Sequence, residues 1–187
     1  PILPPLAGGP VVRGTPGDDS VLLQIATTFR ARGGADAVTG SGEADEILGQ
    51  AGADTINGGD GGDVVRGGGG ADDIRGDAGN DRIRAGGGAD VVRGDDLFGN
   101  VTGADRIFGQ NGDDLLFGGG GRDTVNGGRG DDVVAGEAGN DRLRGGGGED
   151  EINPGPGKDR MWGGADADLF LLNPGAGRRN VIKDWED

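Results

Sequence analysis

Sixteen aspartates of this 187-residue chain form a series in which each stands two residues before an apolar residue and most recur at a spacing of nine. Every step is nine residues from Asp36 to Asp90, and again from Asp105 to Asp168. A carboxylate in such a position can accept hydrogen bonds within its own turn, or it can bind a hard cation. For one aspartate the turn interpretation would be favoured, whereas this many in phase favour cation binding. The chain has no Cys and no His, which excludes thiolate and imidazole zinc sites.

The composition limits the classes of function. The chain holds 47 Gly, 33 acidic and 18 basic residues, for a formal net charge of −15, and only 32% hydrophobic residues. Such a composition is typical of disordered linkers, because little apolar surface offsets the entropy of ordering. The negative charge favours cations as partners and disfavours nucleic acid and anionic membranes. No apolar run approaches the roughly 20 residues that span a bilayer, and we expect no signal peptide in the proline-rich start.

The repeating unit around each aspartate is G-G-x-G-x-D-x-U-x, in which U is apolar. U is apolar in all sixteen cases, and the residue two before Asp is Gly in fourteen. Glycine permits the positive φ angles of a tight turn, and x-U-x is the pattern of a strand with one side chain pointing inward. We predict a six-residue turn and a three-residue strand per unit, with two units per 18-residue coil. Parallel stacking of the coils then buries the U residues as a thin ladder.

This unit resembles the RTX (repeats-in-toxin) nonapeptide family over about residues 14–171. The segments "GGGGADDIR", "GDAGNDRIR", "GGGGRDTVN" and "GEAGNDRLR" match its formula. The resemblance implies an all-β fold, a right-handed parallel β-roll solenoid of two-nonapeptide coils with stacked Ca²⁺ sites and end caps. In that family, motif aspartates of two stacked turns and carbonyl groups of the glycine-rich turns hold each ion. We expect roughly 8 to 12 calcium ions as cofactors.

Two units per coil place successive aspartates on opposite faces. One face would stack Asp45, Asp63, Asp81, Asp105, Asp123, Asp141 and Asp159. The other would stack Asp36, Asp54, Asp72, Asp90, Asp114, Asp132, Asp150 and Asp168. Coils roughly 4.8 Å apart bring these carboxylates close enough to repel, unless a cation lies between them. Oxygen ligands without N or S favour Ca²⁺ over Zn²⁺, and the tightly held waters of Mg²⁺ make it fit less well.

By the resemblance, Asp63 and Asp81 would share one ion, and Asp72 and Asp90 another. The turn glycines predicted to take part in the metal sites are Gly61, Gly70, Gly79, Gly121, Gly130 and Gly139.

Interruptions of the period divide the chain. We expect an N-terminal linker and degenerate capping coil at residues 1–35, a first repeat block at 36–93 and an insertion loop at 94–102. A second block at 103–171 and a C-terminal cap at 172–187 follow. At this end of the chain, Phe170, Ile182 and Trp185 would cover the last coil, because a solenoid needs closed ends.

The outward positions carry two further features. An apolar patch on one sheet comprises Val91, Leu115 and Val133 beside Phe117, and either Leu97 and Phe98 of the insertion or a partner would cover it. An arginine stripe on the opposite sheet comprises Arg82, Arg106, Arg142 and Arg160, with Arg66, Arg84 and Arg144 nearby. These arginines either shield the acidic turns or contact an anionic polysaccharide or a neighbouring domain of the same parent protein.

The resemblance implies a calcium-binding module that folds on binding many ions. Its parent would be a bacterial protein that is exported by type I secretion and is extracellular or held at the cell surface. The alternative is an accessory carbohydrate-binding, adhesin or surface-layer module that uses the arginine stripe and the apolar patch. Without His, Cys or a G-x-S-x-G segment we expect no catalysis by this chain, while the parent protein's activity stays open.

Overall fold

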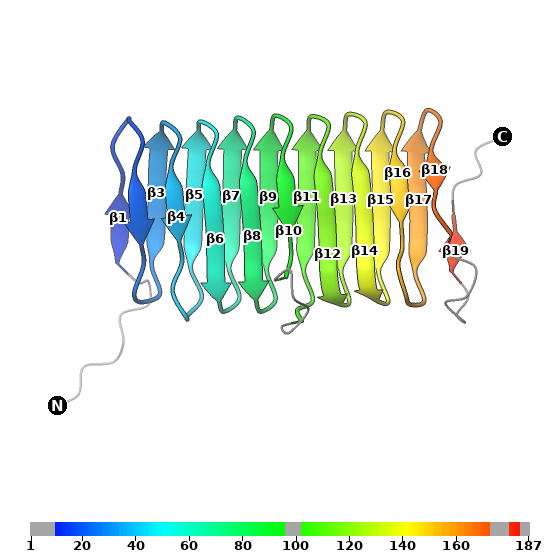
Figure 1. Cartoon of the computed structure of the whole chain (residues 1–187), viewed down its shortest axis with the longest axis horizontal. Coiled ribbons are helices and arrows are strands. Elements are labelled where there is room, and N and C mark those ends of the chain that lie inside the picture. Colours follow the sequence, from blue (N-terminus) through cyan, green and yellow to red (C-terminus); the bar gives the residue numbers. More distant parts are fainter. Residues whose placement is uncertain (1–9, 96–101, 173–179, 184–187) are drawn as a thin grey trace.

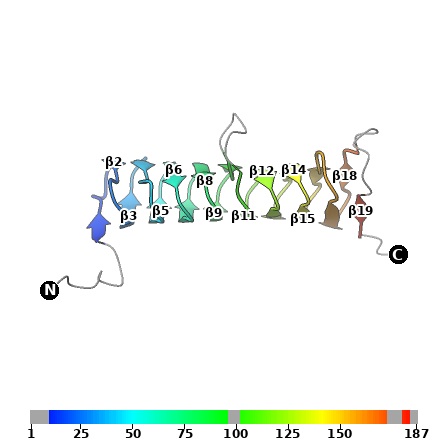
Figure 2. The same ribbon diagram turned by 90° about the horizontal axis from the view of Figure 1, so that it is seen from below.

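The computed structural model describes residues 10–95, 102–172 and 180–183, and these form strands and turns without a helix. The strands make two parallel sheets that face each other along the whole length of the molecule (Figures 1 and 2). Sheet A contains β1 (Val11–Arg13), β3 (Thr28–Gly33), β5 (Glu46–Ala51), β7 (Val64–Gly69), β9 (Arg82–Gly87), β11 (Arg106–Asn111), β13 (Thr124–Arg129), β15 (Arg142–Gly147), β17 (Arg160–Ala165) and β19 (Val181–Ile182). Sheet B contains β2 (Ser20–Leu22), β4 (Ala37–Thr39), β6 (Thr55–Asp60), β8 (Asp73–Ala78), β10 (Val91–Arg93), β12 (Leu115–Gly121), β14 (Val133–Gly139), β16 (Glu151–Asn153) and β18 (Leu169–Phe170).

Each coil contributes one strand to each sheet, so strands that follow one another in the chain lie in opposite sheets. Within a sheet, neighbouring strands are parallel and in register, as in the pairs Ile47 with Val65 and Val65 with Ile83. The predicted all-β parallel solenoid is therefore confirmed. Among the described residues no helix is long and apolar enough to cross a membrane.

The core is a single ladder of apolar side chains between the sheets. Along a strand such as β7, Val65 and Gly67 point inward while Val64 and Arg66 point outward, as strand alternation requires. The ladder consists of Val38, Ile47, Ile56, Val65, Ile74, Ile83, Val92, Ile107, Leu116, Val125, Val134, Leu143, Ile152 and Met161, each at most 2% exposed. One buried apolar residue per nine is a thin core, so the fold depends on what happens in the turns.

The prediction of three-residue strands is wrong for most of the strands. It holds for β1, β2, β4, β10 and β16, but β7 runs over six residues from Val64 to Gly69. The reason is that Gly68 and Gly69 still pair with the same positions of β5 and β9. Turns of identical shape, stacked in parallel, keep their N–H and carbonyl groups aligned, so the ladder of hydrogen bonds continues into the turn.

The six-residue insertion leaves the stacking intact on both sides. Arg82 of β9 pairs with Arg106 of β11, and Val91 of β10 pairs with Leu115 of β12. The apolar patch forms as a row, since Leu115 also pairs with Val133, and Leu115 is 42% exposed. The expected covering residues Leu97 and Phe98 lie outside the described residues.

The ends of the ladder are closed in part by residues of the expected caps. Phe29 is fully buried in the first coils, and Phe170 and Ile182 pack against the last rungs. Trp185 and residues 1–9 lie outside the described residues. The division of the chain into five segments stays a prediction.

Candidate functional site

The motif aspartates stand directly before their strands and point inward, where they form two stacks, one at each edge of the roll. In each stack, the backbone N–H of one aspartate donates to Oδ1 of the aspartate in the following coil. Asp63 N–H donates to Asp81 Oδ1 at 2.8 Å, and Asp72 N–H donates to Asp90 Oδ1 at 2.8 Å. The contact also crosses the insertion, since Asp81 N–H lies 2.8 Å from Asp105 Oδ1. One carboxylate oxygen of each residue is thereby used to fasten two coils together.

The other carboxylate oxygen, Oδ2, is buried and has no hydrogen-bond partner in most of these residues. The thirteen described aspartates that share this property are Asp36, Asp54, Asp63, Asp72, Asp81, Asp90, Asp105, Asp114, Asp123, Asp132, Asp141, Asp150 and Asp159. A buried polar oxygen without a partner costs free energy, and stacked carboxylates add mutual repulsion. The arrangement is unfavourable unless a positive charge or a proton satisfies these oxygens.

The unpartnered oxygens point into a space that a glycine leaves open. A Cβ atom added to Gly58 would lie 2.5 Å from Asp63 Oδ2 and 2.8 Å from the carbonyl oxygen of Gly76 in the next coil. An added Cβ on Gly76 would meet Asp81 Oδ2 and the Gly94 carbonyl in the same way. A carboxylate oxygen and a carbonyl oxygen therefore border a common cradle in successive coils. Both are the hard ligands that Ca²⁺ takes in proteins.

Backbone carbonyls are needed to complete such a site. Within residues 10–95, 102–172 and 180–183 no three acidic side chains converge on one point. A cation in a cradle would therefore be held by one or two carboxylates and otherwise by carbonyl groups. This ligand set fits Ca²⁺, which accepts six to eight oxygens of mixed type.

A comparison with known families agrees with this chemistry. The sequence model of the RTX calcium-binding nonapeptide repeat, which spans four copies of the repeat, matches residues 31–65, 66–96, 101–134, 126–161, 135–170 and 155–177. These matches cover more than half of the chain. The chain belongs to the RTX calcium-binding nonapeptide repeat family. No curated protein matches the chain.

Burial shifts the proton affinity of the RTX aspartates. Removal from water raises the pKa of Asp63, Asp72 and Asp132 to about 7 and that of Asp105 to about 8. The hydrogen bond from the aspartate N–H one coil earlier lowers each pKa, and the charges of neighbouring aspartates raise it again. The charged form is thus disfavoured in the calcium-free fold, and a bound cation would reverse this.

Two predicted ligands differ from the rest. Asp45 Oδ2 already accepts hydrogen bonds from the Ser41 N–H at 2.7 Å and the Ser41 hydroxyl at 2.9 Å. Asp45 Oδ1 accepts from the Thr27 N–H, so this carboxylate behaves as a turn residue. Asp168 is only partly buried, although its Oδ1 accepts from the Asp150 N–H. Both remain predicted ligands.

Among the six predicted turn glycines, Gly61 and Gly79 lie one coil apart, as do Gly121 and Gly139. Gly61 and Gly79 adopt φ angles of 130° and 143°, and a Cβ on Gly79 would collide with the Gly61 carbonyl. Their role as ligands stays a prediction. The carbonyls that border the cradles together with Oδ2 belong instead to the first residue of each unit, such as Gly76 and Gly94. Strand alternation could have identified this residue from the sequence, because it lies two positions after U and must also point inward.

Two further residues of the stacks were not predicted. Asp95 is 4% exposed, its Oδ2 accepts from the Gly120 N–H at 2.6 Å, and its charge helps to raise the pKa of Asp105. Asn180 Oδ1 accepts from the Asp159 N–H at 3.1 Å and ends the first stack. Asn180 could have been found from the sequence, because it stands two residues before Ile182 and so repeats the D-x-U spacing with Asn in place of Asp.

Proposed function

We propose that this RTX module is a calcium-dependent folding unit whose two aspartate stacks hold the ions. The observation that carries the proposal is the set of thirteen buried Oδ2 atoms without a hydrogen-bond partner. Asp63 and Asp81 would bind one ion between their coils, and Asp72 and Asp90 another, with turn carbonyls supplying the remaining oxygens. Bound calcium supplies positive charge that neutralises the stacked carboxylates. Repeated along both stacks, this gives roughly 8 to 12 ions per chain.

The energetics support a module that is unfolded without calcium. One buried apolar residue per nine provides little stabilisation, the formal net charge is −15, and a chain with 47 glycines loses much entropy on ordering. A ligand that binds only the folded form stabilises it by mass action. Since neighbouring sites share the same coils, we expect the ions to bind cooperatively and folding to respond steeply to calcium.

We further propose that the module belongs to a bacterial protein exported by type I secretion and works outside the cell or on its surface. The support is the combination of calcium-binding repeats with a chain that is poorly stable without the ion. Such a chain stays extended where calcium is scarce, passes a narrow channel, and folds where calcium is abundant. The module itself is proposed to be non-catalytic.

Counting bound ions tests this function. Equilibrium dialysis of the whole chain against millimolar calcium, followed by metal analysis, is expected to give roughly 8 to 12 ions per chain. Magnesium at the same concentration is expected to give far fewer, because it dehydrates reluctantly and demands octahedral geometry. Two or fewer calcium ions per chain, or equal binding of magnesium, would contradict the proposal.

A further inference from the structure

The outer face of sheet A carries a dense positive charge on a chain that is strongly negative overall. Its outward positions from β7 to β19 form two rows that run along the roll. The first row is Val64, Arg82, Arg106, Thr124, Arg142, Arg160 and Val181. The second row is Arg66, Arg84, Phe108, Asn126, Arg144 and Trp162. None of these positions is acidic, and we call this surface the arginine face.

Within the part of the chain that the structure describes, the arginines of this face form no ion pair with the aspartates of the acidic turns. Arg66 pairs with Glu46 of β5 at 2.8 Å, and the Arg84 guanidinium lies 5.9 Å from the centre of the Phe108 ring. Arg82, Arg106, Arg142, Arg144 and Arg160 are exposed and form no ion pair with any residue that the structure describes. Arg82 and Arg106 are direct neighbours across two strands, as are Arg142 and Arg160. Strands that lie roughly 4.8 Å apart hold these like charges near each other, so a bound anion would reduce their mutual repulsion.

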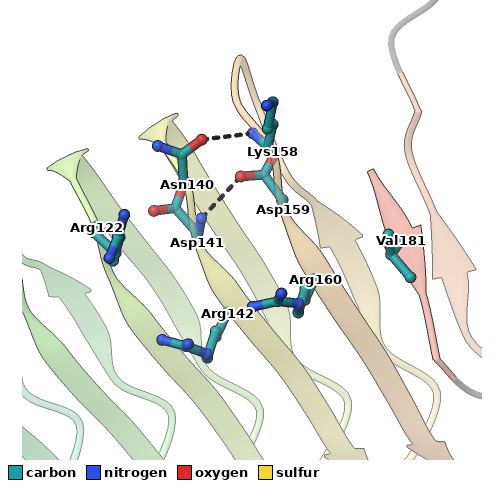
Figure 3. Close-up of a pocket in the computed structure, with 8 residues that line it drawn as sticks. All are labelled: Arg122, Asn140, Asp141, Arg142, Lys158, Asp159, Arg160 and Val181. Atoms are coloured by element: carbon teal, nitrogen blue, oxygen red, sulfur yellow. Dashed lines mark hydrogen bonds between the residues drawn. The ribbon is translucent and has the colours of Figure 1, made fainter. Parts of the chain in front are cut away.

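Two hollows at the β19 end of this face give it a shape that fits a ligand. Figure 3 shows Arg142 and Arg160 next to each other on neighbouring strands, close to the turns that carry Asn140 and Lys158. A hollow of about 520 Å³ is lined by these four residues together with Arg122, Val181 and the motif aspartates Asp141 and Asp159. The Lys158 N–H donates to Asn140 Oδ1 at 3.1 Å, which holds the two turns together.

The second hollow is mainly apolar and lies beside the first. Its volume is about 280 Å³, and Phe108 and Trp162 line it together with Asn126 and Arg144. Arg142 lines both hollows, so they form one strip across β11 to β17. The strip offers aromatic side chains, a side-chain amide and guanidinium groups side by side.

We propose that the arginine face binds an extended acidic polysaccharide, a proposal that rests on the calcium-dependent fold proposed above. The regular rows match a linear polymer that carries one acid group per sugar or per few sugars. Guanidinium groups bind carboxylate or sulfate through paired hydrogen bonds. Phe108 and Trp162 provide flat apolar surfaces against which sugar rings can pack, while Asn126 can bind a hydroxyl. Double-stranded nucleic acid carries one charge per roughly 1.7 Å, which is much denser than the roughly 4.8 Å between successive strands of each row, so it matches the rows less well.

Calcium binding and polysaccharide binding are linked through charge. Each calcium ion adds two positive charges, so roughly eight ions would change the formal net charge from −15 to about +1. The same ions order the coils that bring the arginines into rows. The arginine face therefore forms only in the calcium-loaded chain. In that chain the net negative charge that would repel an acidic polymer has also been neutralised.

The test uses the whole calcium-loaded chain and short oligogalacturonates as the probe, with binding measured by calorimetry. Arg142→Glu combined with Arg160→Glu is expected to weaken binding at least ten-fold and to reduce the slope of log affinity against log salt by about two. The matched control is Arg75→Glu combined with Arg93→Glu, which makes the same charge change on sheet B. The control is expected to retain affinity within about two-fold.

Circular dichroism against calcium, recorded for each variant, separates folding from binding. Failure of the unaltered chain to fold with calcium would refute the calcium function before any sugar is added. If the Glu variant does not fold, Arg142→Gln with Arg160→Gln replaces it and is expected to weaken binding at least five-fold. Absence of oligogalacturonate binding by the folded chain would overturn the polysaccharide proposal. Equal loss in the sheet B control, or equal affinity for DNA or phosphatidylserine vesicles, would also overturn it.

Discussion

Filling one cradle with a methyl group tests whether the cradles hold cations. In Gly58→Ala the new Cβ would lie 2.5 Å from Asp63 Oδ2 and 2.8 Å from the Gly76 carbonyl. Both distances are well inside van der Waals contact, and the carbonyl belongs to the backbone of the next coil, so the coils must shift. Inserting a methyl group into a packed interior costs about 1–3 kcal/mol. The methyl group would also occupy the space between two proposed ligands, so about one ion fewer is expected.

The most sensitive readout is the melting temperature at saturating calcium. For a chain of this size about 1–3 kcal/mol lowers Tm by roughly 2–12 °C. The calcium midpoint, the calcium concentration at which half of the chains are folded, is less sensitive, because the free-energy cost of the substitution is divided among all the ions that bind. If roughly eight ions bind in one transition, the midpoint rises only about 1.2- to 2-fold.

Gly87→Ala is the matched control for this substitution. Gly87 also lies in a β-strand and has no positive φ, and an added Cβ there meets no atom within 4 Å. It is expected to leave Tm unchanged or to raise it slightly, since alanine restricts the unfolded chain. Equal Tm values and equal ion counts for Gly58→Ala and Gly87→Ala would refute the assignment of the cradles.

Four further predictions follow from the stacks. Asp63→Asn is expected to lower the ion count by at least one and to raise the calcium midpoint. Glu149→Gln, which removes an exposed charge, is expected to do neither. Equal effects of the two substitutions in a calcium titration would contradict the assignment of the aspartate stacks as calcium ligands. Calcium should bind more weakly in acid: the pKa of Asp63 is raised to about 7 and that of Asp105 to about 8, so protons compete, and the calcium midpoint should fall from pH 6 to pH 8. In excess chelator the stability of the fold should change with pH in the opposite direction. The stability that protonated Asp105 contributes is complete below about pH 4 and is lost as the pH rises through 8. A β signal in circular dichroism that grows with pH would contradict this. Ser41→Ala should remove the hydroxyl bond to Asp45 Oδ2, keep the backbone N–H bond, and leave the ion count no lower, as measured by dialysis.

Most of the fold could be predicted from the nine-residue period of the sequence. Strand alternation applied to D-x-U places Asp63, Val65 and their counterparts inside, and the 18-residue coil follows from burying them in a ladder. Strand length was missed because hydrogen bonds between stacked turns depend on the neighbouring coil, as for Gly68 beside Gln50 and Gly86. A sequence pattern within one unit does not contain that information.

The candidate site was predictable as a set of aspartates but not as a set of atoms. Two residues with the same motif position differ, since Asp63 Oδ2 is unpartnered while Asp45 Oδ2 is satisfied by Ser41. The difference comes from the turn residue four before Asp45. The Gly76 carbonyl beside Asp63 comes from the following coil, so its proximity is a result of stacking. Asn180 was missed because it follows Asp159 by 21 residues, whereas most neighbours in the stacks are 18 residues apart.

The central claim is that the roll forms only when calcium fills its stacks, and far-ultraviolet circular dichroism against free calcium tests it most directly. In excess chelator at pH 7.5 the chain is expected to give the spectrum of an unfolded polypeptide. On addition of calcium, a β spectrum should appear steeply between sub-millimolar and millimolar concentrations, and magnesium should not replace it. A full β spectrum in chelator, unchanged by calcium, would contradict the account.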